Sequence, residues 1–230
     1  MKTCLQIAVF PFFCACGTLS ASHPLEPGDH QLGVTFGGPF TTSLGPPIPV
    51  PNLIAEGRTG LEPIEELPLD INYGVNLTSI AFGLMGVHGG ASLHLLEGSG
   101  WRPNLAVTER LHLYHNYFDT TKPKDTRMMW GLNELDLTAS WGLGRHFVYA
   151  GVSNVLDLAD PEFLVSPFLG IDLRPKDRRL GFQLETRVLG VNFSPEIWDV
   201  TWLSLGGEPG YGLISVTASL SWALGQLEER

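Results

Sequence analysis

The sequence predicts an all-β fold, an antiparallel up-and-down β-barrel of about 10 to 12 strands. Apolar and polar residues alternate along most of the chain, glycine is abundant at 27 of 230 residues, and long segments of helical periodicity are missing. The stretch 211–225 shows the alternation most clearly. One parity is almost wholly small and uncharged, and the other parity is apolar: Ile214, Val216, Ala218, Leu220, Trp222 and Leu224.

Three regions are expected along the chain. Residues 1–22 are predicted to be a secretory signal peptide, residues 23–52 an N-terminal strand with a Pro-rich loop, and residues 53–230 the barrel. The charge of Lys2, the mostly apolar residues 5–13 and the small residues after them indicate the signal. This apolar run is too short to span a bilayer as a helix, which takes about 20 residues.

All three cysteines, Cys4, Cys14 and Cys16, lie in the predicted signal. The rest of the chain therefore holds no disulfide framework, thiol nucleophile or Cys-ligated zinc. Two routes of processing stay open. Cleavage after residue 17, 21 or 22 would remove the cysteines, whereas residues 13–16 are similar to a bacterial lipobox and predict lipid attachment at Cys16.

Segments with a period of two residues recur after the signal and are the predicted strands. Glycine and proline clusters separate them, including a turn expected at Gly86, Gly89 and Gly90. The predicted strands cover residues 30–36, 69–76, 79–86, 91–96, 103–117, 133–144, 146–154, 163–173, 180–192, 199–205 and 211–225.

The composition of the polar parity predicts which face of the barrel points outward. Charged residues are only 17% of the chain, below the roughly 25% of soluble domains. A polar face of Ser, Thr, Gly and Asn suits a narrow lumen, and the apolar face then contacts lipid. The sequence therefore predicts a transmembrane barrel.

Charges of both signs fall on the polar parity, where they are expected to form a network within the lumen. Glu109 is the exception, because it falls on the apolar parity of its segment. Six aromatic residues are interpreted as interfacial girdles, with core packing as the alternative: Tyr114, Tyr117, Trp130, Trp141, Trp202 and Tyr211. The expected lumen network consists of Arg110, Glu134, Asp136, Asp172, Glu185 and Arg187.

With this pattern over residues 30–224, the chain resembles the small outer-membrane β-barrel proteins of Gram-negative bacteria. The terminal strand ISVTASLSWAL is similar to the assembly signal of that group, although residues 225–230 follow the usual end point. The resemblance implies an exported protein in the outer membrane. Its implied partners are outer-membrane lipid and, during biogenesis, the barrel-assembly machinery.

No catalytic, cofactor-binding or metal site is predicted, and no cofactor is expected. Residues 151–154, GVSN, are similar to the His-x-Ser-Asn stretch of lipid A deacylases, but Gly151 stands where the base would be. His146 has the wrong parity to activate Ser153. The histidines at positions 88, 94, 112 and 115 are interpreted as loop or lumen residues, since His112 and His115 have opposite parity.

The leading functional prediction is a non-enzymatic envelope protein, either structural or a narrow pore for small solutes. Two alternatives remain open: a soluble or lipid-anchored periplasmic barrel that binds an apolar ligand, and an outer-membrane lipid hydrolase. The first alternative requires the apolar parity to line the cavity. A net charge of −10 and the lack of a basic run exclude binding to nucleic acid through its phosphates.

Overall fold

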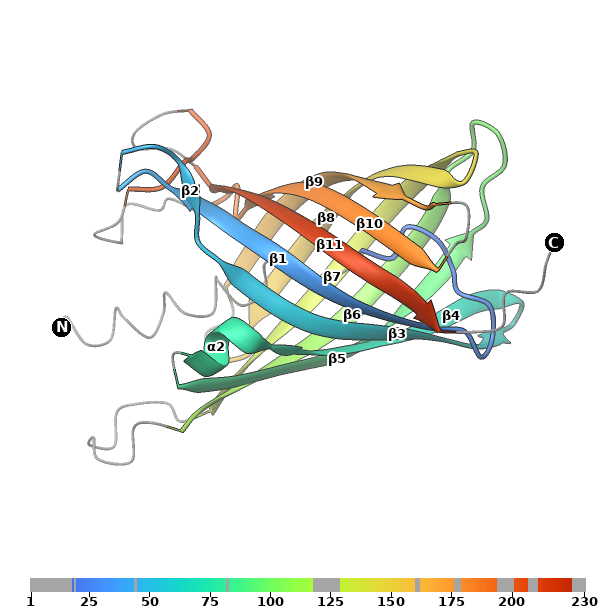
Figure 1. The fold of residues 1–230 in the computed structure, drawn as a ribbon, viewed down its shortest axis with the longest axis horizontal. Coiled ribbons are helices and arrows are strands. Elements are labelled where there is room, and N and C mark those ends of the chain that lie inside the picture. Colours follow the sequence, from blue (N-terminus) through green and yellow to red (C-terminus); the bar gives the residue numbers. More distant parts are fainter. Residues whose placement is uncertain are drawn as a thin grey trace.

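A closed antiparallel barrel of ten strands, with one short extra strand, forms the molecule (Figure 1). The predicted fold class is thus confirmed. The structure is a computed structural model that describes residues 18, 20–43, 45–81, 83–117, 129–159, 162–175, 179–193, 201–206 and 211–224. The barrel strands are β1 (His30–Thr41), β3 (Asn52–Ile64), β4 (Leu67–Asn76), β5 (Leu84–Leu96), β6 (Asn104–Asn116), β7 (Met129–Leu143), β8 (His146–Asp157), β9 (Phe163–Leu173), β10 (Leu180–Leu189) and β11 (Leu213–Leu224).

Closure of the barrel comes from the first and last strands. Each of the other strands pairs with the next along the chain, and β1 pairs with β11 from His30↔Leu224 to Pro39↔Ser215. The barrel therefore begins at His30 and includes the strand that the sequence analysis assigned to a separate N-terminal region. Among the described residues, no helix is long and apolar enough to cross a membrane.

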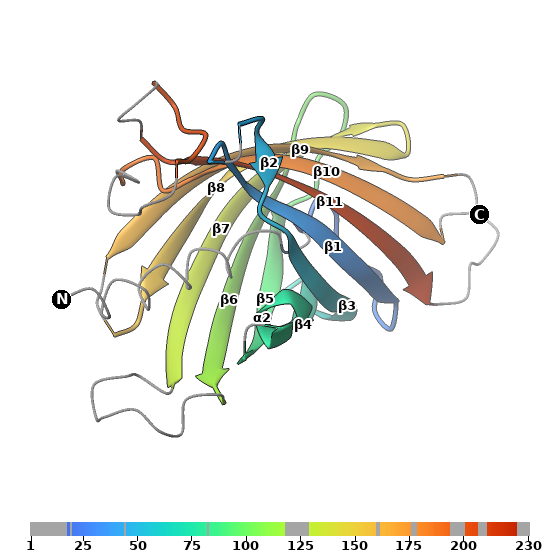
Figure 2. The same cartoon turned by 60° about the vertical axis from the view of Figure 1, so that its left-hand side comes forward.

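The two ends of the barrel differ in the length of their connections. At the short-turn end, β3 joins β4 through Glu65 and Glu66, both with positive φ, which is the requirement of a type I′ hairpin turn. Gly144, with φ of 66°, makes the turn between β7 and β8. The long-loop end carries β2 (Ile48–Pro49), α2 (Leu77–Ala81) and the connection between β10 and β11 (Figures 1 and 2).

Most polar side chains of the strands point into the barrel and most apolar side chains point outward, as predicted. On β7 and β9, Glu134 and Asp172 are 0% exposed, whereas Leu169 is 64% exposed. The terminal strand follows the same rule, since Ser219 and Ser221 are buried and Leu220 is 58% exposed. The arrangement is the reverse of what an apolar ligand cavity requires.

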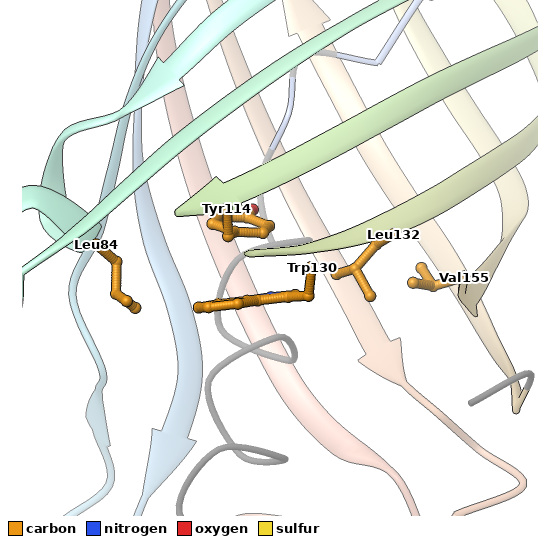
Figure 3. Packing of buried hydrophobic residues seen from close by; sticks show 5 residues of the cluster. All are labelled: Leu84, Tyr114, Trp130, Leu132 and Val155. Atoms are coloured by element: carbon orange, nitrogen blue, oxygen red, sulfur yellow. The ribbon is translucent and has the colours of Figure 1, made fainter. Parts of the chain in front are cut away.

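An apolar cluster lies on the inner side of β5–β8 toward the long-loop end (Figure 3). Tyr114 and Trp130 are stacked there with ring centroids 5.5 Å apart. Both are buried on the lumenal parity, so their assignment to an exposed girdle was wrong; Trp202 is also buried, whereas Tyr117 and Tyr211 are exposed. The cluster consists of Leu84, Tyr114, Trp130, Leu132 and Val155.

Two predicted strands, 79–86 and 199–205, are not formed over their predicted lengths. Residues 77–81 form the short helix α2, because Asn76 caps it by accepting a hydrogen bond from the Ser79 backbone N–H at 2.9 Å. In the described part of 199–205, Trp202 and Leu205 make isolated bridges only. The last strand was predicted to begin at residue 211, but β11 begins at Leu213, and Tyr211 makes only an isolated bridge.

The turn expected at Gly86, Gly89 and Gly90 was also wrong. The strand β5 runs through all three glycines and joins two predicted strands into one. A Cβ at Gly90 would overlap the backbone carbonyl oxygen of Glu109 on the neighbouring strand. The glycine here therefore serves close approach of strands and not chain reversal.

Candidate functional site in the barrel lumen

Glu134 is the centre of a buried network in the middle of the lumen. Its Oε1 accepts hydrogen bonds from Arg187 Nη1 at 2.9 Å and from Ser153 Oγ at 3.1 Å. Its Oε2 lies 3.0 Å from His112 Nε2 and 3.5 Å from Arg110 Nη1. The charge of this fully buried carboxylate is thus balanced by guanidinium groups from two different strands.

The network extends to two further carboxylates. Arg110 Nη1 donates to Asp136 Oδ2 at 2.6 Å, and Arg187 donates to Glu185 Oε1 at 3.0 Å. The guanidinium carbon of Arg187 also lies 4.8 Å from the centroid of the Phe168 ring. Of the six residues in the expected network, the structure brings five together here: Arg110, Glu134, Asp136, Glu185 and Arg187.

Asp172, the sixth residue, belongs to a separate cluster nearer the short-turn end. Arg174 binds it through two hydrogen bonds of 2.9 Å, and Gln183 Nε2 donates to it at 3.3 Å. Asp70 forms a third charged cluster with Arg58 and with His94, whose Nε2 lies 2.9 Å from Asp70 Oδ2. The sequence analysis missed this third cluster, although Asp70 and His94 both fall on the lumenal parity of their strands.

Residues 20–25 fold back from the start of β1 into the lumen, and we call them the lumenal segment. The Ser20 hydroxyl donates to Glu185 Oε2 and the Ser22 hydroxyl donates to Asp172 Oδ2, both at 2.6 Å. The Leu25 backbone N–H donates to Asp70 Oδ1 at 3.1 Å. The segment therefore contacts the central network and both charged clusters.

Lumenal side chains also donate hydrogen bonds to the backbone of this segment. Arg58 Nη2 donates to the His23 carbonyl oxygen at 3.0 Å, and Gln183 Nε2 donates to the Ser20 carbonyl oxygen at 3.2 Å. The Ser140 hydroxyl donates to the Ser22 carbonyl oxygen. Residues 20–22 lie within the predicted signal peptide, so the mature protein keeps their contacts after cleavage at residue 17 or lipid attachment at Cys16, but not after cleavage at residue 21 or 22. Cys16 and its expected lipid lie outside the described residues.

The lumenal segment contains one histidine, His23. Its ring stacks on Phe147, with centroids 5.2 Å apart and an interplanar angle of 13°. Loss of hydration, together with the positive charges of Arg174 and Arg58, lowers the pKa of His23 to about 3, although Asp172 and Asp70 oppose the shift. His23 also borders an open cavity of about 380 Å³ lined by Arg102, Asn104 and Phe147 among others.

The residues considered for catalysis do not meet as a nucleophile and a histidine base. Ser153 donates to Glu134, so that the carboxylate lies between the hydroxyl and His112. His146 lies at the opposite end of β8 from Ser153, where its Nδ1 accepts a hydrogen bond from the Arg174 backbone N–H at 3.0 Å.

The remaining histidines divide between the two faces of the wall. His88, His94 and His112 are buried on the lumenal parity, and His115 is exposed on the outer one. Within the part of the chain that the structure describes, no group of three or more His, Cys, Asp or Glu side chains could hold a metal ion. No family model matches the chain, and no curated protein matches it in sequence.

Proposed function

We propose that the protein is a non-enzymatic β-barrel of the outer membrane of a Gram-negative bacterium, with a structural role in the envelope. One observation carries the proposal: the lumen is polar and charged, and the outer wall is apolar. Apolar surface of this extent is stable in contact with hydrocarbon and is unfavourable in water. The pairing of β1 with β11, which closes the barrel, supports the proposal further, because every strand edge must be paired in lipid.

The loops support an orientation for the barrel in the membrane. Outer-membrane barrels have short periplasmic turns and longer external loops. The short-turn end, where β1 starts and β11 ends, would therefore face the periplasm. The lumenal segment would enter the barrel from that side, as expected of an N-terminus that has been exported through the periplasm.

The contacts across the lumen favour a structural role over a steadily open pore. Arg187 and Glu134 join distant strands there, and residues 20–25 bind Glu185 and Asp172 on the lumenal wall. A narrow pore for small solutes is the second candidate. It is favoured by the attachment of the lumenal segment through hydrogen bonds, since such a segment can leave while the barrel stays closed.

Two measurements on the detergent-extracted protein test the proposal. We expect recovery in the outer-membrane fraction and a gel band in cold SDS that shifts on boiling. Recovery in the soluble fraction with no heat shift would contradict the membrane assignment.

Conductance in planar bilayers then separates the two roles. We expect no steady conductance from the wild-type protein, and brief openings from the Ser20→Ala/Ser22→Ala variant, which loses two hydroxyl contacts to the lumen. The matched control is Ser99→Ala in an exposed turn. A steadily open wild-type channel would favour the pore.

A further inference from the structure

Glu109 lies on the outer wall, between apolar residues of β6. It is the sixth residue of the 13-residue strand β6, is exposed, and is flanked on the same face by Val107 and Leu111. Its cross-strand neighbours are Ala91 on β5 and Leu135 on β7. An ionisable side chain at such a position is unfavourable in hydrocarbon and marks a functional surface.

One amide side chain contacts this carboxylate, and a second lies two strands away on the same face. Asn133 Nδ2 donates to Glu109 Oε1 at 3.0 Å, and this is the one hydrogen bond to the carboxylate among the described residues. Asn154 follows one strand further, opposite Leu135, and its Oδ1 has no partner in the described structure. The neighbouring outward residues of β5 are small, Gly89 and Ala91. We call Gly89, Ala91, Glu109, Asn133 and Asn154 the polar patch.

The far wall of the barrel has a different surface. Its outward residues on β10, β11 and β1 are mainly large and apolar, with Thr186 as a polar exception. The exposed apolar side chains there include Phe36, Phe182, Leu184 and Leu220. The two walls therefore suit different neighbours, and only the far wall is matched to lipid over its whole height.

We propose that the polar patch on β5–β8 is the interface with a second copy of this chain within the membrane. This inference rests on the proposed function, because the polar patch is unusual only where the outer wall meets lipid. The patch holds an acceptor, Glu109, and two amide donors, Asn133 and Asn154. A two-fold axis through it would let the amides of one copy donate to the carboxylate of the other, as a self-complementary interface requires.

Small residues next to the carboxylate support the same arrangement. No described atom other than the Asn72 carbonyl oxygen, at 4.0 Å, lies within reach of a Cβ built at Gly89. The second wall can therefore approach closely at Gly89 and Ala91. Close approach lets side chains as short as Asn and Glu bridge the two copies.

Photo-cross-linking in intact cells tests the proposal. Leu111, beside Glu109, is replaced by p-benzoylphenylalanine, and Leu220 on β11, on the far wall, receives the same residue as a matched control. We expect an adduct of twice the monomer mass from position 111 and none from position 220. An adduct with lipid only, an adduct of another protein's mass, or no adduct at position 111 overturns the inference.

Substitutions then test whether the polar groups hold the copies together. Glu109→Leu should lower the yield of the dimer adduct at least tenfold, whereas Glu109→Gln, which still accepts a hydrogen bond, should retain most of it. Thr186→Leu, on the far wall, should leave the yield unchanged. An undiminished yield in Glu109→Leu overturns the role of the polar patch.

The two proposals fail in different ways. A protein that fractionates with the outer membrane and shifts on heating, but gives no dimer adduct, overturns the interface and leaves the proposed function intact. A protein absent from the outer membrane overturns both.

Discussion

Arg187 and Glu134 are joined at 2.9 Å although their strands, β10 and β7, are separated around the barrel by β8 and β9. The contact therefore crosses the lumen instead of following the sheet. Arg110 approaches the same carboxylate from β6 on its other side. Glu134 thus connects distant parts of the wall, and its loss should affect the stability of the whole barrel.

Replacement of Glu134 by Ala is expected to destabilise the barrel strongly. Two guanidinium groups and the Ser153 hydroxyl would lose a partner while remaining buried, which costs about 3–5 kcal/mol for a broken buried ion pair. The midpoint of urea unfolding in lipid vesicles measures this change. Glu62→Gln, at an exposed position of β3, is the control and should leave the midpoint unchanged. Equal midpoints for Glu134→Ala and the wild-type protein would rule out the central role of this carboxylate.

Gly170→Ala is expected to destabilise the barrel by overpacking. A Cβ at this position would collide with the Tyr149 ring, which is buried and packed edge-on against Phe168. Such overpacking typically costs about 1–3 kcal/mol. Gly142→Ala is the matched control, since its Cβ would meet its nearest neighbour, Phe147, at 3.8 Å.

A double-mutant cycle checks the assigned cause. If the collision is with the Tyr149 ring, Gly170→Ala should have little further effect in a Tyr149→Ala background. An equal loss of stability in both backgrounds would show that the ring is not the cause.

Acidification is expected to weaken the docking of the lumenal segment. The pKa of His23 is lowered to about 3 when docked, so that between its ordinary pKa and pH 3 only the released segment binds a proton. From pH 7 to pH 5, the docking constant should fall by about 25-fold, because each pH unit below the ordinary pKa of about 6.5 contributes a factor of nearly ten.

Hydrogen exchange of a peptide covering residues 20–29 measures this release. His23→Gln, which does not titrate, provides the reference for intrinsic exchange at each pH. The charged groups near His23 are Arg58, Asp70, Asp172 and Arg174. An identical pH response in the His23→Gln variant would assign the effect to these groups instead.

Leu169→Arg tests the lipid contact of the outer wall. This side chain is 64% exposed in the middle of β9, and an arginine at mid-depth in a membrane barrel costs about 2–4 kcal/mol. Trp101→Arg, in a turn where the side chain is 94% exposed, should cost little. The free energy of folding into lipid vesicles measures both variants, and equal values would argue against lipid at position 169.

Alternation along the strands was sufficient to predict the fold class and the lumenal parity. The sequence placed Glu134, Asp136 and Arg110 in the lumen because each of them is next in sequence to a leucine that points outward, and neighbouring residues of a strand point to opposite faces. Their partners across the barrel could not be predicted, since alternation gives the direction of a side chain but not the curvature that brings β7 and β10 together.

Other features depend on pairing that a local pattern does not contain. Residues 199–205 alternate like a strand, but β11 already pairs with both β10 and β1, and Trp202 makes only an isolated bridge to Thr41 at the end of β1. Residues 20–25 have no alternation at all, and their place in the lumen depends on Glu185, Asp172 and Asp70, which are far away in the sequence.

The register of β1 with β11 also has a consequence for how the chain reaches its folded state. His30 pairs with Leu224, which lies near the other end of the polypeptide, so β1 and β11 can pair only after almost the whole chain has been made. Until β11 has been made, a partial sheet has two unpaired edges. Its outer face also exposes apolar side chains. Closure is thus a late event of high contact order, and the unclosed chain is expected to be prone to aggregation.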